Sequence, residues 1–182
     1  MVQMPTGTGK THVLAEIVNN RVSGGAGKVL VVAHRIELVA QIREMVDAFF
    51  ALAQQHVGSF APTKDDIGDR IKVESIQTVA RRIDSLDFTP DLVVIDEAHH
   101  ALAKTYRILW EKWPKAKFLG LTATPCRMNK TGFTDLFDEL ITSWSIAKFI
   151  EQGVLSVFDY VSIRPNSEEQ RLIDMLQKRG AD

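Results

Sequence analysis

The pattern of apolar positions divides the chain into short buried runs separated by longer segments. Three runs of Val, Leu, Ile and Ala lack the polar alternation of a half-buried strand. They are KVLVVAH at 28–34, DLVVIDE at 91–97 and KFLGLTA at 117–123. Strands that are apolar on both faces are typical of a parallel sheet covered by helices on each side. We expect further strands at 71–77 and 154–163, and a short one beginning at Val2.

The segments between these runs have the spacing of amphipathic helices. Within 36–52, one face carries the apolar residues Leu38, Ile42, Met45 and Phe49. Other helices are expected at 11–21, around 78–83 and over 167–179, where Ser167 and Gln170 have capping-box spacing. The alternation of strands and helices predicts a doubly wound α/β domain, with a mostly parallel sheet and helices on both faces. Ligands of such a sheet bind at the carboxyl ends of its strands.

The first candidate site is the glycine-rich stretch PTGTGKT, which follows a short apolar start and opens a predicted helix. Its glycines allow backbone N–H groups to turn toward phosphate oxygens, and the helix N-terminus adds positive potential. Lys10 can reach the outer phosphates, and Thr11 can bind Mg²⁺. The strict pattern GxxxxGK[ST] has glycine where this chain has Met4, so a chance Gly/Thr-rich turn is the alternative. The residues expected to bind the nucleotide are Thr6, Gly7, Thr8, Gly9, Lys10 and Thr11.

Two adjacent carboxylates end the run DLVVIDE, and an apolar strand would not carry them for packing. Asp96 can hold Mg²⁺, while Glu97 can orient and deprotonate the water that attacks the γ-phosphate. The candidate catalytic residues are therefore Glu97, Asp96 and Lys10, and the candidate Mg²⁺ ligands are Thr11 and Asp96. His99 and His100 lack HExxH spacing and a nearby cysteine, which favours a hydrogen-bonding role for His99 over a zinc site.

A third candidate element is FLGLTATP, in which Thr122 and Thr124 stand at the carboxyl end of another expected strand. Pro125 ends that strand. Hydroxyl groups at this edge can contact the carboxylates of a neighbouring strand. A plain threonine-rich turn is the alternative for this segment taken alone.

Composition narrows the class of protein without identifying a partner. The 182 residues are 45% apolar and 25% charged, which suits one globular domain with a hydrophobic core. The formal net charge of -1 gives no electrostatic indication of a nucleic-acid partner. A single cysteine, Cys126, excludes an internal disulfide. The sequence has no signal peptide and no membrane span, so we expect a soluble, cytoplasmic protein.

Five segments, taken in order, resemble the first RecA-like domain of the second helicase superfamily. They are GTGKT, AHRIELVAQ at 33–41, ESIQT at 74–78, DEAH at 96–99 and TATP at 122–125. AHRIELVAQ, DEAHH with KTYRILW, and LGLTATPCR with LFDELITSWSIAKFIEQGVL look most like the branch of type I and III restriction-enzyme helicase subunits and XPB-like DNA helicases. DEAD-box RNA helicases carry a PTREL-type segment where this chain has AHRIEL, so DNA is expected rather than RNA.

The resemblance implies ATP hydrolysis with Mg²⁺, coupled to movement along nucleic acid. It implies that Lys10 contacts the β- and γ-phosphates, that Glu97 is the catalytic base, and that His99, Thr122 and Thr124 couple hydrolysis to movement. It also places four residues on the nucleic-acid face, namely His34, Arg35, Gln77 and Thr78. The resemblance also removes the objection to Met4, because the phosphate-binding loop of this superfamily usually has the pattern GxGKT, without the earlier glycine. For Arg35, a solvated position at a helix start is the alternative.

The resemblance covers residues 1–163, an N-terminal RecA-like ATP-binding domain, and 164–182 is expected to form a helix leading toward a second domain outside this chain. In this superfamily an upstream glutamine reads adenine, and the second domain supplies an arginine finger worth about 10³ to 10⁵ in rate. We therefore expect this polypeptide to bind ATP weakly and not to unwind a duplex alone. The alternatives are a non-catalytic remnant that binds DNA or protein, and a motor acting on polypeptide.

The stripe of Tyr106, Leu109, Trp110 and Trp113 is expected to face the core, with solvated lysines around it.

Overall fold

In the computed structural model, which describes residues 1–23, 27–57, 70–101, 104–125 and 136–159, the strands form one parallel sheet. Its order is β3-β2-β4-β5-β1-β6. The strands are β1 (Val2–Gln3), β2 (Val29–Ala33), β3 (Ile71–Ser75), β4 (Leu92–Asp96), β5 (Lys117–Thr122) and β6 (Ile141–Thr142). The helices are α1 (Lys10–Ser23), α2 (Ile36–Val57), α4 (Ile76–Arg82), the 3-10 turn η2 (Ala98–His100), α5 (Lys104–Lys112) and α6 (Ile146–Glu151).

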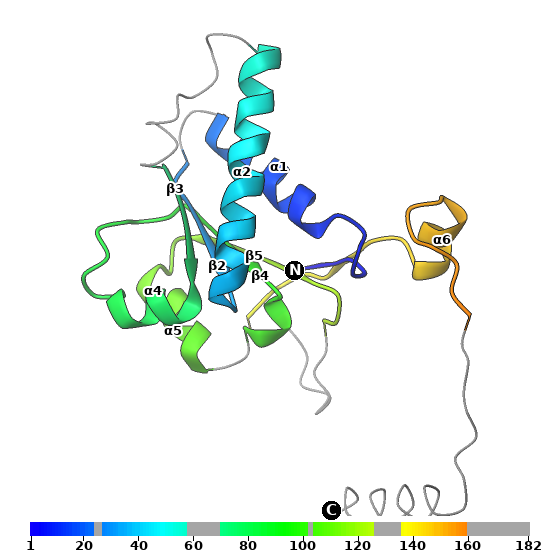
Figure 1. The fold of residues 1–182 in the computed structure, drawn as a ribbon. Helices are drawn as coiled ribbons and strands as arrows, with labels where there is room; N and C mark the ends of the chain where they lie inside the picture. Colours follow the sequence, from blue (N-terminus) through cyan, green and yellow to red (C-terminus); the bar gives the residue numbers. More distant parts are fainter. Residues whose placement is uncertain (24–26, 58–69, 102–103, 126–135, 160–182) are drawn as a thin grey trace, which may run out of the picture.

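Helices cover both faces of the sheet, with α1 and α2 on one side and α4 and α5 on the other (Figure 1). The central strands supply alternate residues to the two layers. In β2, Val31 packs with α1 and α2, whereas Val32 packs in the opposite layer. This arrangement explains why the strand sequences are apolar without alternation. It confirms the predicted α/β class with a parallel sheet and helices on both faces.

The helix stripes predicted from the sequence are confirmed. Leu38, Ile42, Met45 and Phe49 of α2 all contact the core layer on the α1 side. Tyr106 and Leu109 of α5 are fully buried, and Trp110 and Trp113 pack in the same layer. None of the helices in the described part of the chain has the length and apolar character needed to span a bilayer.

The strand predicted at 154–163 is wrong over the residues that the structure describes. Residues 154–159 form no strand, and Val157 and Phe158 are 80% and 66% exposed. A strand needs an open edge to pair with, and the position beside β1 is occupied by β6, which the sequence analysis did not predict. Residues 160–163 of that strand and the helix expected at 164–182 lie outside the described residues. Figure 1 shows α6, which follows β6, set apart from the helices that cover the sheet.

The parallel register brings the carboxyl ends of the strands to one edge. Gln3 of β1 is level with Thr122 of β5, and Leu121 of β5 is level with Asp96 of β4. β5 therefore separates the strand that precedes the glycine-rich loop from the strand that ends in the acids. The candidate residues found far apart in the sequence meet along this edge.

Candidate functional site

The glycine-rich loop connects β1 to the start of α1. Gly7 and Gly9 have φ values of +82° and +88°, a backbone conformation that favours glycine. Thr8 Oγ1 donates to the carbonyl of Pro5 at 2.7 Å and braces the loop from within. The first helical bonds, from His12 and Val13 N–H to the carbonyl of Gly9, place the helix N-terminus directly at the loop. Turned glycines at a helix N-terminus form an anion-binding cradle.

Met4 stands outside the part of the loop that needs glycine. Among the described residues other than glycine, only Glu97 has positive φ, so Met4 has an ordinary backbone conformation. Its N–H continues the sheet by donating to the carbonyl of Thr122 at 2.9 Å, and its side chain is buried. A side chain at this position therefore extends the core and does not obstruct the cradle.

Lys10 curls over the inside of the loop. Its Nζ donates to the carbonyls of Met4 and Pro5, each at 3.3 Å. Burial raises the pKa of the Asp96 carboxyl group, and the Lys10 ammonium is near enough to oppose part of that rise. Lys10 is thus held at the loop by neutral carbonyl oxygens, where it can turn toward a phosphate.

The two acids at the end of β4 differ in environment. Burial raises the pKa of Asp96, and the negative charge of Glu97 raises it further, against smaller opposing effects that include Lys10 and His99. Glu97 adopts a left-handed conformation, with φ 51° and ψ 51°, which is strained for a residue other than glycine. Such strain concentrates at functional sites. The turn directs the Glu97 carboxylate toward His99, with Oε2 at 3.3 Å from Nδ1.

The three predicted coupling residues lie together. His99 Nδ1 is 3.0 Å from Thr122 Oγ1, which accepts from the N–H of Thr124 at 3.1 Å. The Thr122 hydroxyl also donates to the carbonyl of Thr124 at 3.3 Å. Thr122 is fully buried. His99 therefore links Glu97 to the end of β5.

Three of the four residues predicted for the nucleic-acid face line one hollow of about 450 Å³. It is bordered by His34, Arg35, Ile36, Glu37, Ser75, Gln77 and Arg81. Gln77 Nε2 donates to the carbonyl of His34 at 3.1 Å and joins the ends of β3 and β2. Thr78 is placed differently, because its N–H and hydroxyl lie 3.2 and 3.0 Å from Ser75 Oγ at the start of α4. Ser75 is the residue that caps the helix, and Thr78 is absent from the lining of this hollow.

Arg81, which was not predicted from the sequence, adds a second guanidinium to that hollow. Its Nε donates to the carbonyl of Gln77 at 3.1 Å, one helical turn earlier. The spacing of four residues from Gln77 was a signal for this placement, because residues i and i+4 share a helix face.

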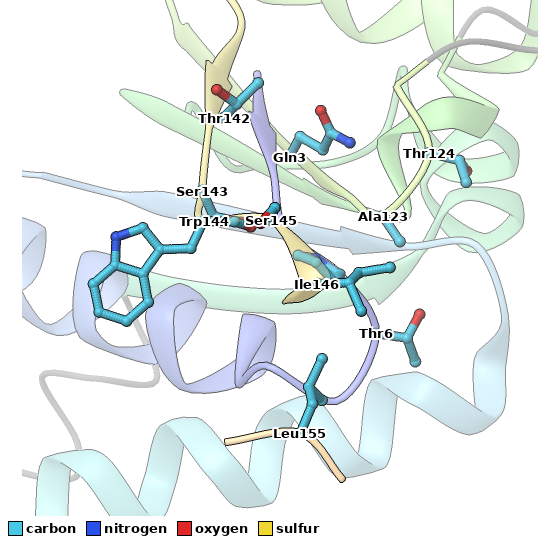
Figure 2. Close-up of a pocket in the computed structure, with 11 residues that line it drawn as sticks. Gln3, Thr6, Ala123, Thr124, Thr142, Ser143, Trp144, Ser145, Ile146 and Leu155 are labelled. Carbon is cyan, nitrogen blue, oxygen red and sulfur yellow. The ribbon is translucent and has the colours of Figure 1, made fainter. Parts of the chain in front are cut away.

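A second hollow, of about 480 Å³, adjoins the glycine-rich loop (Figure 2). Pro5 and Thr6 border it on one side, Ala123 and Thr124 on another, and residues after β6 close it. Figure 2 shows Ile146 and Leu155 near the loop that carries Thr6, while the indole of Trp144 points away. A Cβ on Gly7 would lie only 3.2 Å from Leu155 Cδ2, so this segment contacts the loop. This segment was not predicted from the sequence to lie at the site, although a serine such as Ser145 is a preferred helix N-cap. In the structure its hydroxyl accepts from the N–H of Lys148 at 3.2 Å.

The donor set fits Mg²⁺ bound together with a nucleotide. In the ranges that the structure describes, no group of three or more His, Cys, Asp or Glu side chains could hold a metal ion. Mg²⁺ does not need such a group, because it is usually bound by one or two carboxylates, waters and substrate phosphates. The half-buried carboxyl group of Asp96 and the hydroxyl of Thr11 at the start of α1 are oxygen donors of this kind.

Comparison with known proteins gives a consistent assignment. The family model for the type III restriction enzyme, res subunit, matches residues 1–127. A 51.5 kDa protein of a Lactococcus phage is 30% identical over 163 residues, which are 90% of this chain and 32% of that protein. The DNA 3'-5' translocase XPB2 of Sulfurisphaera tokodaii is 26% identical over all of this chain and 40% of its own length. The UvsW helicase of bacteriophage T4 has a similar fold, with a TM-score of 0.61, 18% identity, and coverage of 79% of this chain and 54% of that one. This chain thus spans two fifths or less of these two curated relatives.

Proposed function

This chain belongs to the family of the type III restriction enzyme res subunit, within the helicase branch that also includes XPB-like proteins, and we propose that it is the ATP-binding motor domain of an ATP-dependent DNA helicase or translocase. The observation that carries the proposal is the order of groups along the carboxyl edge of the sheet. The glycine-rich loop follows β1, Thr122 ends the neighbouring β5, and Asp96 and Glu97 end the next strand.

In this proposal the loop and Lys10 bind the phosphates of ATP. Backbone N–H groups of Gly7 to Thr11 position the phosphate chain, and Lys10 leaves its carbonyl partners for the outer phosphates. Asp96 and Thr11 hold Mg²⁺, which supplies positive charge against the negative charge on the transferring phosphoryl oxygens. Glu97 accepts a proton from the attacking water.

His99 and the threonines respond to that site in the proposal. Because His99 is within 3.3 Å of Glu97 and 3.0 Å of Thr122, a change in charge at Glu97 alters both contacts. Thr122 passes the change to the backbone of Thr124. This is the proposed start of coupling between hydrolysis and movement.

DNA is the proposed partner. XPB2 is named a DNA 3'-5' translocase, and the type I restriction enzyme EcoAI endonuclease subunit is 28% identical over 90% of this chain. The hollow that contains Arg35, Gln77 and Arg81 provides two guanidinium groups and an amide. Such groups bind phosphates without reading a base sequence, as a motor that moves along a strand requires.

The test is Lys10-dependent ATP binding. We expect Lys10→Ala to weaken the affinity for a fluorescent ATP analogue with Mg²⁺ by about tenfold or more, because a hydrogen-bonded charge contributes about 1.5–3 kcal/mol. Lys115→Ala is the matched control, since it removes an exposed lysine from the turn before β5. Equal affinities of wild type and Lys10→Ala would instead favour a non-catalytic remnant that binds DNA or protein.

The need for a second motor domain stays a prediction. We propose that the 182-residue polypeptide hydrolyses ATP slowly and does not unwind a duplex, because an arginine finger from another domain supplies about 10³ to 10⁵ in rate. DNA-stimulated turnover by this polypeptide at the level of two-domain helicases, abolished by Lys10→Ala, would refute it.

A further inference from the structure

A row of side chains runs along the carboxyl edge from one candidate site to the other. Gln77 follows β3, His34 follows β2, His100 and His99 follow β4, and Thr122 ends β5. The strand order places these groups side by side, although their sequence order differs. We call the three imidazoles of His34, His100 and His99 the histidine row.

The contacts along the histidine row are continuous. The His34 and His100 rings stack at 3.9 Å between centroids with an interplanar angle of 14°. The His99 and His100 rings are 4.1 Å apart and tilted by 42°. His99 then contacts Thr122 at 3.0 Å and Glu97 at 3.3 Å, while the backbone of His34 accepts from Gln77.

His34 is also seated against the core. The hydroxyl of Tyr106 lies 3.4 Å from His34 Nδ1, and the Tyr106 side chain is fully buried. Burial, with a smaller contribution from Asp96, raises the pKa of Tyr106 to about 12, so the hydroxyl stays protonated at neutral pH. His34 is thus held between a fixed phenol and the His100 ring.

We propose that His100 is a positioning residue that couples the nucleotide site to the DNA face by stacking on His34. The inference rests on the proposed function and adds a residue to it. His99 and His100 belong to the same three-residue turn, whose Ala98 packs closely on β5. A shift of His99 on nucleotide binding therefore carries the His100 ring, and the stacked His34 ring must follow.

The direct experiment measures the coupling between two ligands. The affinity of the 182-residue chain for fluorescein-labelled oligothymidylate is measured by anisotropy, without nucleotide and with saturating Mg²⁺ and ATPγS. We expect ATPγS to change the dissociation constant of wild type about fivefold or more, the lower end of typical allosteric coupling. His100→Ala should bring that ratio close to one, because an aromatic pair accounts for about two- to tenfold in an equilibrium constant.

Two further variants separate stacking from general damage. His100→Phe retains a flat ring and should keep most of the wild-type ratio. Trp110→Leu removes another stacked pair, in which Trp110 and Phe118 lie 4.0 Å apart at 11°, away from the row, and should also keep the ratio. The inference is overturned if His100→Ala keeps the wild-type ratio, if His100→Phe loses it as completely as alanine, or if Trp110→Leu loses it equally.

A spectroscopic measurement on wild type tests the same point when a variant fails to fold. Adding Mg²⁺ and ATPγS without DNA should shift the ring resonances of His34, which can be assigned among the five histidines by substitution. Unchanged His34 resonances at nucleotide saturation would overturn the inference. Failure of wild type to bind ATPγS in a Lys10-dependent manner, or to bind oligothymidylate, would instead overturn the proposed function, so the two failures are distinguishable.

Discussion

Adding one methyl group at Gly120 should push the turn η2, which follows Asp96 and Glu97, away from β5. Gly120 is a buried residue of β5, and a Cβ built there would lie 2.6 Å from Ala98 Cβ and 2.8 Å from Phe137 Cζ. The Phe137 ring can rotate, but the Cβ of Ala98 is attached directly to the backbone of η2. We therefore expect Gly120→Ala to displace the turn that follows Glu97.

The size of this displacement follows from the contact distance. Ordinary carbon contacts begin at about 3.4 Å, so the turn must retreat by about 0.8 Å. Along the line of the 3.0 Å contact between His99 and Thr122, this retreat would give about 3.8 Å, beyond hydrogen-bonding range. Overpacking of this kind costs about 1–3 kcal/mol. At about 2–4 °C per kcal/mol for a chain of this size, the melting temperature should fall by about 2–12 °C.

Thermal unfolding followed by circular dichroism measures the fall, and Ala98→Gly supplies the control. Ala98→Gly removes the methyl group that Gly120→Ala meets, so the double variant should lose less stability than the sum of the two single variants. A melting temperature of Gly120→Ala within about 1 °C of wild type would refute the reasoning. Strict additivity would show that Ala98 is not the group displaced.

Three further predictions concern the candidate sites. Asp96→Asn should raise the melting temperature without nucleotide at pH 7, since burial raises the pKa of Asp96 and disfavours its charge. In scanning fluorimetry from pH 4 to 8, the difference in melting temperature between the variant and wild type should grow above pH 3.8, the pKa of the unfolded state, and level off above the raised pKa. A difference in melting temperature that is independent of pH would contradict this. Arg35→Ala and Arg81→Ala should each lower the slope of log affinity for oligothymidylate against log salt by about 0.7, and an unchanged slope means no phosphate contact. Tyr106→Phe should lower the free energy of unfolding in urea by about 0.5–1.5 kcal/mol, through loss of the hydroxyl that contacts His34; no loss would mean that this contact is not stabilising.

Local sequence patterns identified the central strands and the glycine-rich loop of this protein. The apolar runs that became β2, β4 and β5 could be recognised because a strand covered on both faces needs apolar residues on each. The glycines of the loop could be recognised because Gly7 and Gly9 take backbone conformations that other residues rarely adopt. The family resemblance is confirmed by the matched family model. The roles of the candidate site residues remain predictions.

Relations between distant segments were decided by the tertiary structure. Strand order set His34 against His100, and no periodicity in the chain encodes that contact. The same holds for the segment with Leu155, which the sequence predicted as a strand and the structure places against Gly7, because β6 already pairs with the outer edge of β1. Sequence alone therefore determined which chemical groups the chain carries and where the central strands β2, β4 and β5 end. Which groups touch was decided by the pairing of strands, since pairing depends on backbone edges that become neighbours only when the whole sheet forms.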